Sequence, residues 1–269
     1  MVAGNFGDVV KHNILLEVVD LLTKENDSFN YFETHGSHMS QEICSDHSTG
    51  IMRVNALIKK NKPTKEHVVL LKAIIEGHYL KYIDFNFTTK LNYPSSWILV
   101  HKLLYYKRMK EHTIDVCEID STTYSKTISD LRYDYPNIHY HCTDGYTFLE
   151  NHLSYGLRPS LVLIDPCYDE SKDELKRTLS RMESIVDELE SKEIPFLIWY
   201  PVYKVKFNNI GFPFKNEDNF IEVDNTPNPS TQNLDTSGMI FSNALMNYIP
   251  EVKSRINYLN KLGFKWKVK

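Results

Sequence analysis

The chain has 269 residues, of which 42% are hydrophobic and 25% are charged. That length is enough for one large domain or about two of ordinary size, and the composition is that of a globular protein rather than a disordered or collagen-like one. The formal net charge of −4 gives no overall basic field. A nucleic-acid partner would therefore have to be held by a local basic patch.

The cysteines and the distribution of apolar residues bear on the compartment. Four cysteines occur without any C-x-x-C pair, which argues against a disulfide framework and fits free thiols in a reducing compartment. No stretch approaches about 18 consecutive apolar residues, and the N-terminus has no basic start followed by an apolar run. We therefore expect a cytoplasmic protein with no signal peptide, no membrane partner and no evident obligate protein partner.

The first fifty residues predict a helix and then a strand that ends in polar residues. Asp8 to Leu22 carries apolar side chains at helical spacing. Phe29–Phe32 is predicted to be a short strand, and Glu33-Thr34-His35-Gly36-Ser37 follows it. A strand that runs into a loop carrying an acid and a glycine is how a nucleotide site of an α/β protein usually opens.

Residues 51–92 differ from the rest of the chain. They hold eight basic and three acidic residues, and the breaker Lys62-Pro63 interrupts stripes of helical spacing. We predict a small, helical, basic insertion subdomain here, with residues 1–50 and 93–269 forming the main domain. A basic helical surface either contacts an anionic partner or is simply solvated, and the sequence leaves both readings open.

From residue 93 onward, strands and helices alternate. The predicted helices are Ser96–Met109, Ser121–Tyr133, Tyr146–Leu153, Lys172–Leu189 and Ala244–Lys261. The predicted strands are Thr113–Ile119, Ile138–Cys142, Ser160–Ile164, Pro195–Tyr200, Asn219–Val223, Gly238–Ser242 and Phe264–Val268. This alternation predicts an α/β, Rossmann-like fold whose mixed sheet is mostly parallel and has an antiparallel end.

The most informative segment is Asp165-Pro166-Cys167-Tyr168, which directly follows an apolar strand. Ligands of open α/β sheets bind at the carboxyl ends of strands, so this acid is expected in the binding crevice. The alternative is a loop whose Asp only caps a turn. An apolar strand that ends in Asp-Pro-x-aromatic is similar to the Asp/Asn/Ser-Pro-Pro-aromatic motif of amino methyltransferases that use S-adenosyl-L-methionine, with Cys167 in place of the second proline.

The chemistry of an adenine amine explains these residue types. The amine is a poor nucleophile because its lone pair is delocalised into the ring. Hydrogen bonds to the Asp165 carboxylate and the Pro166 carbonyl would bend it toward sp³ geometry and align the lone pair with a methyl group for in-line transfer. Tyr168 would stack on the base after it is flipped out.

Two further acids follow other predicted strands. Glu118 lies at the end of Thr113–Ile119, where a carboxylate holds ribose hydroxyls in nucleotide-binding folds. Asp144-Gly145 follows Ile138–Cys142, where the acid could accept a hydrogen bond from the cofactor's adenine amine and the glycine permits a close approach. Strand-end acids also serve as helix caps, so each is a weak signal by itself.

Taken in order, these motifs resemble the RlmJ family, which methylates the N6 amine of one adenine in 23S ribosomal RNA. The resemblance rests on Ala3-Gly4-Asn5, Asp8-Val9-Val10-Lys11-His12, Thr34-His35, Tyr93-Pro94-x-Ser96, Glu118, Asp144-Gly145-Tyr146, Ile164-Asp165-Pro166-x-Tyr168, Trp199-Tyr200-Pro201 and Ser237-Gly238-Met239-Ile240. It implies S-adenosyl-L-methionine as cofactor, held by His12, His35, Ser96, Glu118, Asp144, Gly145 and Asp165, with Asp165, Pro166 and Tyr168 catalytic. The residues expected to bind the RNA are Lys11, Lys59, Lys60 and Lys62.

The loop after the first strand departs from the family. It reads His35-Gly36-Ser37-His38-Met39-Ser40, where the family has His-Ala-Gly-Ala-Gly-Arg. The rival hypothesis is accordingly a degenerate member that binds nucleic acid without methyl transfer, with a possible link to the use of external DNA that the family's older description mentions. A nucleotide- or DNA-processing protein of another α/β class is a third hypothesis, and the absence of a P-loop argues against an NTPase.

Metal and thiol chemistry are not expected. His35, His38, Cys44 and His47 could be drawn together as a zinc site, but their spacing matches no standard ligand pattern. No base that would activate Cys167 as a nucleophile can be identified from the sequence. We therefore predict no metal.

Overall fold

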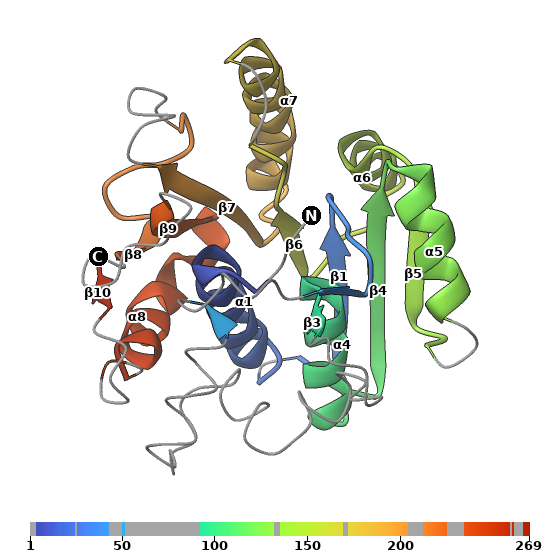
Figure 1. Cartoon of the computed structure of the whole chain (residues 1–269), viewed down its shortest axis with the longest axis horizontal. Coiled ribbons are helices and arrows are strands. Elements are labelled where there is room, and N and C mark those ends of the chain that lie inside the picture. Colours follow the sequence, from blue (N-terminus) through green and yellow to red (C-terminus); the bar gives the residue numbers. More distant parts are fainter. Residues whose placement is uncertain are drawn as a thin grey trace.

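The computed structural model describes residues 4–24, 26–42, 50–51, 92–131, 135–168, 172–203, 212–224, 234–258, 260 and 266–269. Their centre is a mixed sheet of eight strands (Figure 1). In chain order these strands are β1 (Ser28–Glu33), β4 (Glu111–Glu118), β5 (Ile138–Cys142), β6 (Leu161–Ile164), β7 (Phe196–Tyr203), β8 (Phe220–Asp224), β9 (Leu234–Phe241) and β10 (Lys267–Val268).

The order of the strands across the sheet is β10-β8-β9-β7-β6-β1-β4-β5. The five strands from β7 to β5 in this order run parallel to their neighbours, whereas β9, β8 and β10 pair antiparallel. From β1 the chain builds outward through β4 to β5, and from β6 it builds in the other direction to β7. The switch between the two directions lies between β1 and β6, and the crevice of an open α/β sheet forms at the carboxyl ends of such strands.

Helices cover both faces of this sheet. They are α1 (Phe6–Leu22), α4 (Ser96–Tyr106), α5 (Ser121–Leu131), α6 (Gly145–Ser154), α7 (Lys172–Ser191) and α8 (Ile249–Tyr258), with a 3₁₀ helix η2 (Asn243–Tyr248) before the last. Helices α1, α4 and α8 pack together on one face, and α6 and α7 pack on the other. A separate pair of short antiparallel strands, β2 (Ser40–Glu42) and β3 (Asn92–Pro94), was not predicted from the sequence.

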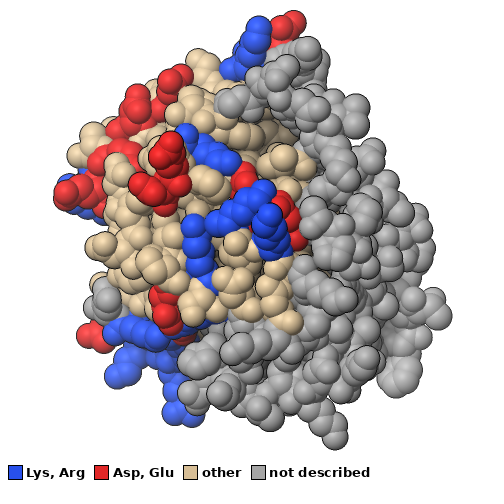
Figure 2. Space-filling view, turned by 90° about the vertical axis from the view of Figure 1, so that its left-hand side faces the viewer, with Lys and Arg blue, Asp and Glu red and all other residues tan. Residues whose placement is uncertain are grey.

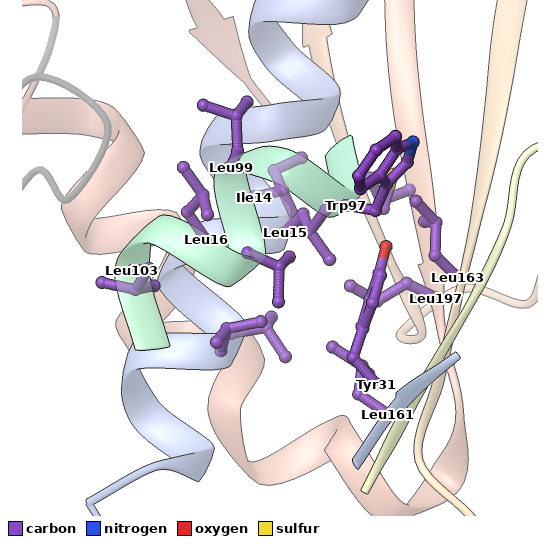
Figure 3. Packing of buried hydrophobic residues seen from close by; sticks show 14 of the residues in the cluster. Ile14, Leu15, Leu16, Tyr31, Trp97, Leu99, Leu103, Leu161, Leu163 and Leu197 are labelled. Carbon is purple, nitrogen blue, oxygen red and sulfur yellow. The ribbon is translucent and has the colours of Figure 1, made fainter. Parts of the chain in front are cut away.

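Two apolar clusters fill the space between the sheet and its helices. Successive residues of a strand point to opposite faces, and β6 illustrates this because Leu161 and Leu163 join one cluster whereas Val162 and Ile164 join the other. Figure 3 shows the first cluster, in which leucines of β6 meet Trp97 and the side chains of α1 and α4. A strand that is buried on both faces is apolar at every position, as the Ser160–Ile164 run predicted.

Helix α1 owes its start to its own sequence. The Asn5 side chain accepts from the Asp8 amide, and the Asp8 side chain accepts from the Asn5 amide, which makes a capping box. The Asp8 carboxylate also accepts from the amide of Gly4, whose φ of +86° favours glycine. The start of α1 is therefore fixed, and so is the direction in which Lys11 and His12 leave it.

The elements predicted outside residues 51–92 are present, with different bounds at several ends. The prediction of one helix over Ala244–Lys261 was wrong in its first part. The 3₁₀ helix η2 occupies Asn243–Tyr248, and the α-helix α8 begins only at Ile249. Pro250 has no amide hydrogen to continue a helical ladder from the preceding residues, whereas the first turn of a new helix tolerates it. Helix α4 ends at Tyr106 rather than Met109, since Arg108 takes a left-handed φ of 57°.

Residues 52–91 lie outside the described residues, and the predicted helical insertion remains a prediction. The segments on either side of it belong to one sheet, since β1 pairs directly with β4. Among the described residues, no helix is long and apolar enough to cross a membrane.

Candidate active site

Asp165 and Lys11 form a buried ion pair at the switch point of the sheet. Asp165 follows β6, and the Lys11 Nζ atom from α1 lies 2.6 Å from its Oδ2 atom. Burial raises the pKa of Asp165, and the Lys11 ammonium opposes that rise. Burial by itself would lower the pKa of Lys11, but the carboxylates of Asp165 and Asp8 outweigh it and leave this pKa raised. The pair therefore favours the charged form of Lys11, whereas the pKa of Asp165 stays above its ordinary value even with the ammonium beside it.

Glu33, the last residue of β1, is a buried carboxyl at the same end of the sheet. It accepts hydrogen bonds from Ser96 Oγ at 2.6 Å and from Tyr31 Oη at 2.8 Å. Burial raises the pKa of Glu33 to about 7, although both hydroxyls favour its charged form. Glu33 was noted in the predicted loop after the first strand but was not assigned to the site. Its position at the end of an inner strand of the sheet was the signal that could have found it.

His12 follows Lys11 on α1, and one of its ring nitrogens has no hydrogen-bond partner among the described residues. Its Nδ1 atom is 2.8 Å from Tyr93 Oη, and the two rings stack. Its Nε2 atom is buried and has no hydrogen-bond partner in the described structure. Burial and the neighbouring Lys11 ammonium hold the pKa of His12 well below its usual value, so the ring is neutral.

His35 and the start of α6 pack against each other. The His35 ring meets Tyr146 edge to face, with 5.0 Å between the ring centroids, and its Nδ1 atom is 2.7 Å from Thr34 Oγ1. A Cβ atom on Gly145 would fall 1.9 Å from the Thr34 carbonyl oxygen, so only glycine permits this approach. Burial lowers the pKa of His35 to about 4.

The two acids at the outer strands have separate partners. Glu118 Oε1 accepts from the Asp120 amide at 2.8 Å, and burial raises the pKa of Glu118. Asp144 caps α6 because its carboxylate accepts a hydrogen bond from the Thr147 amide. The Arg181 guanidinium donates two further hydrogen bonds to this carboxylate, at 2.7 and 2.9 Å. Burial would raise the pKa of Asp144, but these donors outweigh it and lower the pKa to about 2. Arg181, on α7, was not expected from the sequence.

Tyr168 is buried rather than exposed as a platform. Its hydroxyl donates to the Trp199 carbonyl oxygen at 2.7 Å, and its ring lies against Trp199 and Phe212. Pro166 is also buried, whereas Cys167 is exposed. The stacking of Tyr168 on a flipped base therefore stays a prediction.

Several of the expected residues thus fall into two groups. Lys11, Ser96 and Asp165 gather around Glu33, with His12 next to Lys11 on α1, while Asp144 and Gly145 begin α6 beside the His35 loop. Lys59, Lys60 and Lys62 lie outside the described residues. On the described part of the β10 side of the molecule, acidic and basic side chains occur in neighbouring groups of both signs (Figure 2).

In the described ranges, no three or more His, Cys, Asp or Glu side chains are arranged to hold a metal ion. His38 contacts Asp130 and the Ser40 carbonyl oxygen, and Cys44 and His47 lie outside the described residues.

The chain is similar to known proteins over most of its length. The family model described as Ribosomal RNA large subunit methyltransferase D, RlmJ, matches residues 27–263. The chain is 24% identical over 272 residues to Ribosomal RNA large subunit methyltransferase J of Haemophilus influenzae, covering 96% of this chain and 90% of the relative. It is 23% identical over 207 residues to the protein of that name from Escherichia coli, covering 74% and 68%.

A solved structure supports the fold. The crystal structure of a protein from Legionella pneumophila strain Philadelphia 1 superposes with a TM-score of 0.69 at 21% identity, covering 99% of this chain and 97% of that one. Because the family model matches residues 27–263, which is most of the sequence, the chain belongs to the RlmJ family.

Proposed function

We propose that this protein transfers a methyl group from S-adenosyl-L-methionine to the N6 amine of an adenine in 23S ribosomal RNA. The observation that carries the proposal is the Asp165 carboxylate, which follows β6 at the switch point and is paired with Lys11 at 2.6 Å. The family to which the chain belongs and the names of its two relatives support ribosomal RNA as the substrate.

Asp165 and Pro166 act on the amine of the target base. An ionised Asp165 accepts a hydrogen bond from one N6–H, and the Pro166 carbonyl can accept from the other, so that the nitrogen lone pair is released from the ring. The Lys11 ammonium opposes the rise that burial causes in the pKa of Asp165 and so favours the ionised carboxylate. Transfer of the methyl group would leave positive charge on the nitrogen, and the Asp165 carboxylate that accepts the N6–H hydrogen bond would be placed to take that proton.

The residues present fit the cofactor. Bound S-adenosyl-L-methionine supplies a methyl group on a positively charged sulfur. The buried and unpartnered Nε2 atom of His12 is a hydrogen-bonding group that a ligand can satisfy. Glu118 would accept hydrogen bonds from the ribose hydroxyls, and Asp144 from the adenine amine. The remaining residues of the proposed cofactor site are His35, Ser96, Gly145 and Asp165.

The rival reading, a family member that has lost methyl transfer, rests on the altered loop after β1. That loop keeps its one essential glycine, because the Gly36 amide donates to the Cys117 carbonyl oxygen and a Cβ atom there would fall 2.5 Å from Val116. The family to which the chain belongs and the names of its two relatives also favour an enzyme. The enzyme is the better supported reading.

Calorimetric titration with S-adenosyl-L-methionine tests the proposal first. We expect a dissociation constant for the cofactor in the micromolar range. In a separate assay, we expect the protein to transfer labelled methyl groups to large-subunit ribosomal RNA that lacks the modification. Binding of RNA without any binding of the cofactor at millimolar concentration would instead support the rival reading.

A further inference from the structure

Tyr146, the second residue of α6, carries a buried hydroxyl that the mechanism above does not use. The residue is 3% exposed. Its Oη atom has no hydrogen-bond partner in the described part of the chain. The hydroxyls of the other buried tyrosines at this end of the sheet are partnered, as Tyr31 is by Glu33 and Tyr168 by the Trp199 carbonyl oxygen.

The surroundings of Tyr146 fix its ring in the site. Gly145 lets the start of α6 approach the Thr34 backbone, which brings the Tyr146 ring edge to face with His35. The Arg181 guanidinium lies over the same ring, with its carbon 5.2 Å from the centroid. The ring is therefore held between the β1 loop and α7, and the hydroxyl has little freedom to seek another partner.

The charges that act on this hydroxyl belong to the proposed site. Burial raises the pKa of Tyr146, the Arg181 guanidinium opposes that rise, and the carboxylates of Asp144 and Asp165 add to it. The hydroxyl is consequently protonated at neutral pH and remains able to donate a hydrogen bond.

An unpaired buried hydroxyl costs free energy, and a phenylalanine would fill the same space without that cost. We propose that the Tyr146 hydroxyl binds the cofactor, as a hydrogen-bond donor to a polar atom of S-adenosyl-L-methionine. This inference rests on the proposed function. The cofactor is the occupant that the contacts favour, because Tyr146 touches His35 and follows Asp144 by two residues, and both of those are proposed cofactor ligands.

The test is the substitution Tyr146→Phe, with Tyr200→Phe as the matched control. Tyr200 is equally buried, but its hydroxyl donates to Glu222 Oε1 at 2.8 Å. Each variant is titrated with S-adenosyl-L-methionine in a calorimeter and melted without ligand. We expect Tyr146→Phe to weaken cofactor binding about 3- to 10-fold and to melt no lower than the wild type. Tyr200→Phe should melt lower and bind the cofactor as the wild type does.

The outcomes separate this inference from the proposed function. If the wild type does not bind the cofactor, the proposed function fails and the inference fails with it. If the wild type binds and Tyr146→Phe binds equally well, the inference alone is wrong. Unchanged cofactor binding together with a raised KM for RNA would assign the hydroxyl to the target base and contradict the inference. Weaker binding accompanied by a lower melting temperature would also contradict it, because the hydroxyl would then have a structural partner.

Discussion

Lys11 Nζ lies 2.6 Å from Asp165 Oδ2, which joins the N-terminal helix to the loop that follows the central strand β6. Both side chains are largely buried, with exposed fractions of 10% and 14%. Removing one partner of such a pair leaves an uncompensated charge or forces the other to become neutral. The protonation state of Asp165 therefore depends on Lys11.

Lys11→Met is expected to shift the pH dependence of methyl transfer. Without the ammonium, burial raises the pKa of Asp165 further, so that the carboxylate becomes protonated at a higher pH. The acidic limb of the kcat profile should move to higher pH in Lys11→Met and stay near the wild-type position in Lys11→Arg. An acidic limb that is the same in all three proteins would show that Lys11 does not control this carboxyl.

Asp165→Asn is expected to lower kcat for methyl transfer by at least about 100-fold. The amide keeps the shape of the side chain but accepts a hydrogen bond less strongly and cannot take a proton. Far-UV circular dichroism should be unchanged, which separates lost chemistry from lost folding. Near-normal transfer to unmodified ribosomal RNA by this variant would remove Asp165 from the mechanism.

Glu118→Ala and Asp144→Ala are expected to weaken cofactor binding by about 1.5–3 kcal/mol for each charge-assisted hydrogen bond lost. Asp144→Ala should also lower stability by about 1 kcal/mol, because the residue caps α6. Titration calorimetry gives the affinities, and the affinity for RNA serves as the control that should hardly change. Wild-type affinity for the cofactor in both variants would place its site elsewhere.

Glu33 is expected to make stability depend on pH. Its pKa is about 7 in the folded protein against an ordinary value of 4.5, so between these values the folded state holds a proton that the unfolded chain has released. The contribution of Glu33 to stability is therefore greatest below pH 4.5 and falls as the pH rises through about 7, by at most about 1.4 kcal/mol per pH unit.

Denaturant unfolding of the wild type and Glu33→Gln at several pH values measures this contribution. The glutamine does not titrate, so the free energy of unfolding of the wild type minus that of the variant should fall from pH 5 to pH 7. A difference that is constant over this range would mean that Glu33 ionises at its ordinary pKa.

Replacing Lys59, Lys60 and Lys62 together by Glu tests the predicted basic insertion. Phosphate contacts release counterions, so each lost contact should lower the slope of log affinity against log salt by about 0.7–0.9. We expect weaker RNA binding and a flatter salt dependence, with cofactor affinity unchanged. If the variant matches the wild type both in its affinity for RNA and in the slope of log affinity against log salt, the insertion does not bind RNA through these lysines.

The sequence predicted the layers of this fold because its signals are local. The Ser160–Ile164 run is apolar at every position, and Asp8 to Leu22 has helical spacing, so a central strand and a helix could be placed without knowledge of their partners. The β2–β3 pair escaped prediction because its three-residue strands come from distant segments, where neither carries a pattern. The late start of α8 reflects the missing amide hydrogen of Pro250, which weighs more than the apolar spacing around it.

Site residues could be predicted where they lie at the end of a strand. They could not be predicted where tertiary contacts determine which side chains meet. Asp165 was found because it directly follows an apolar strand. Lys11 and Asp165, which form an ion pair, are 154 positions apart in the chain. The hydrogen bonds from Arg181 to Asp144 depend on how α7 packs beside α6. Such contacts leave no mark on the spacing of either residue.

Analysis of the methylated product tests the central claim most directly. The protein is incubated with S-adenosyl-L-methionine that carries a labelled methyl group and with 23S ribosomal RNA that lacks the modification, and the RNA is then digested to nucleosides. We predict that the label is recovered as N6-methyladenosine and that the Asp165→Asn protein gives none. Label in another nucleoside, or no label in RNA that the wild-type protein demonstrably binds, would contradict the account.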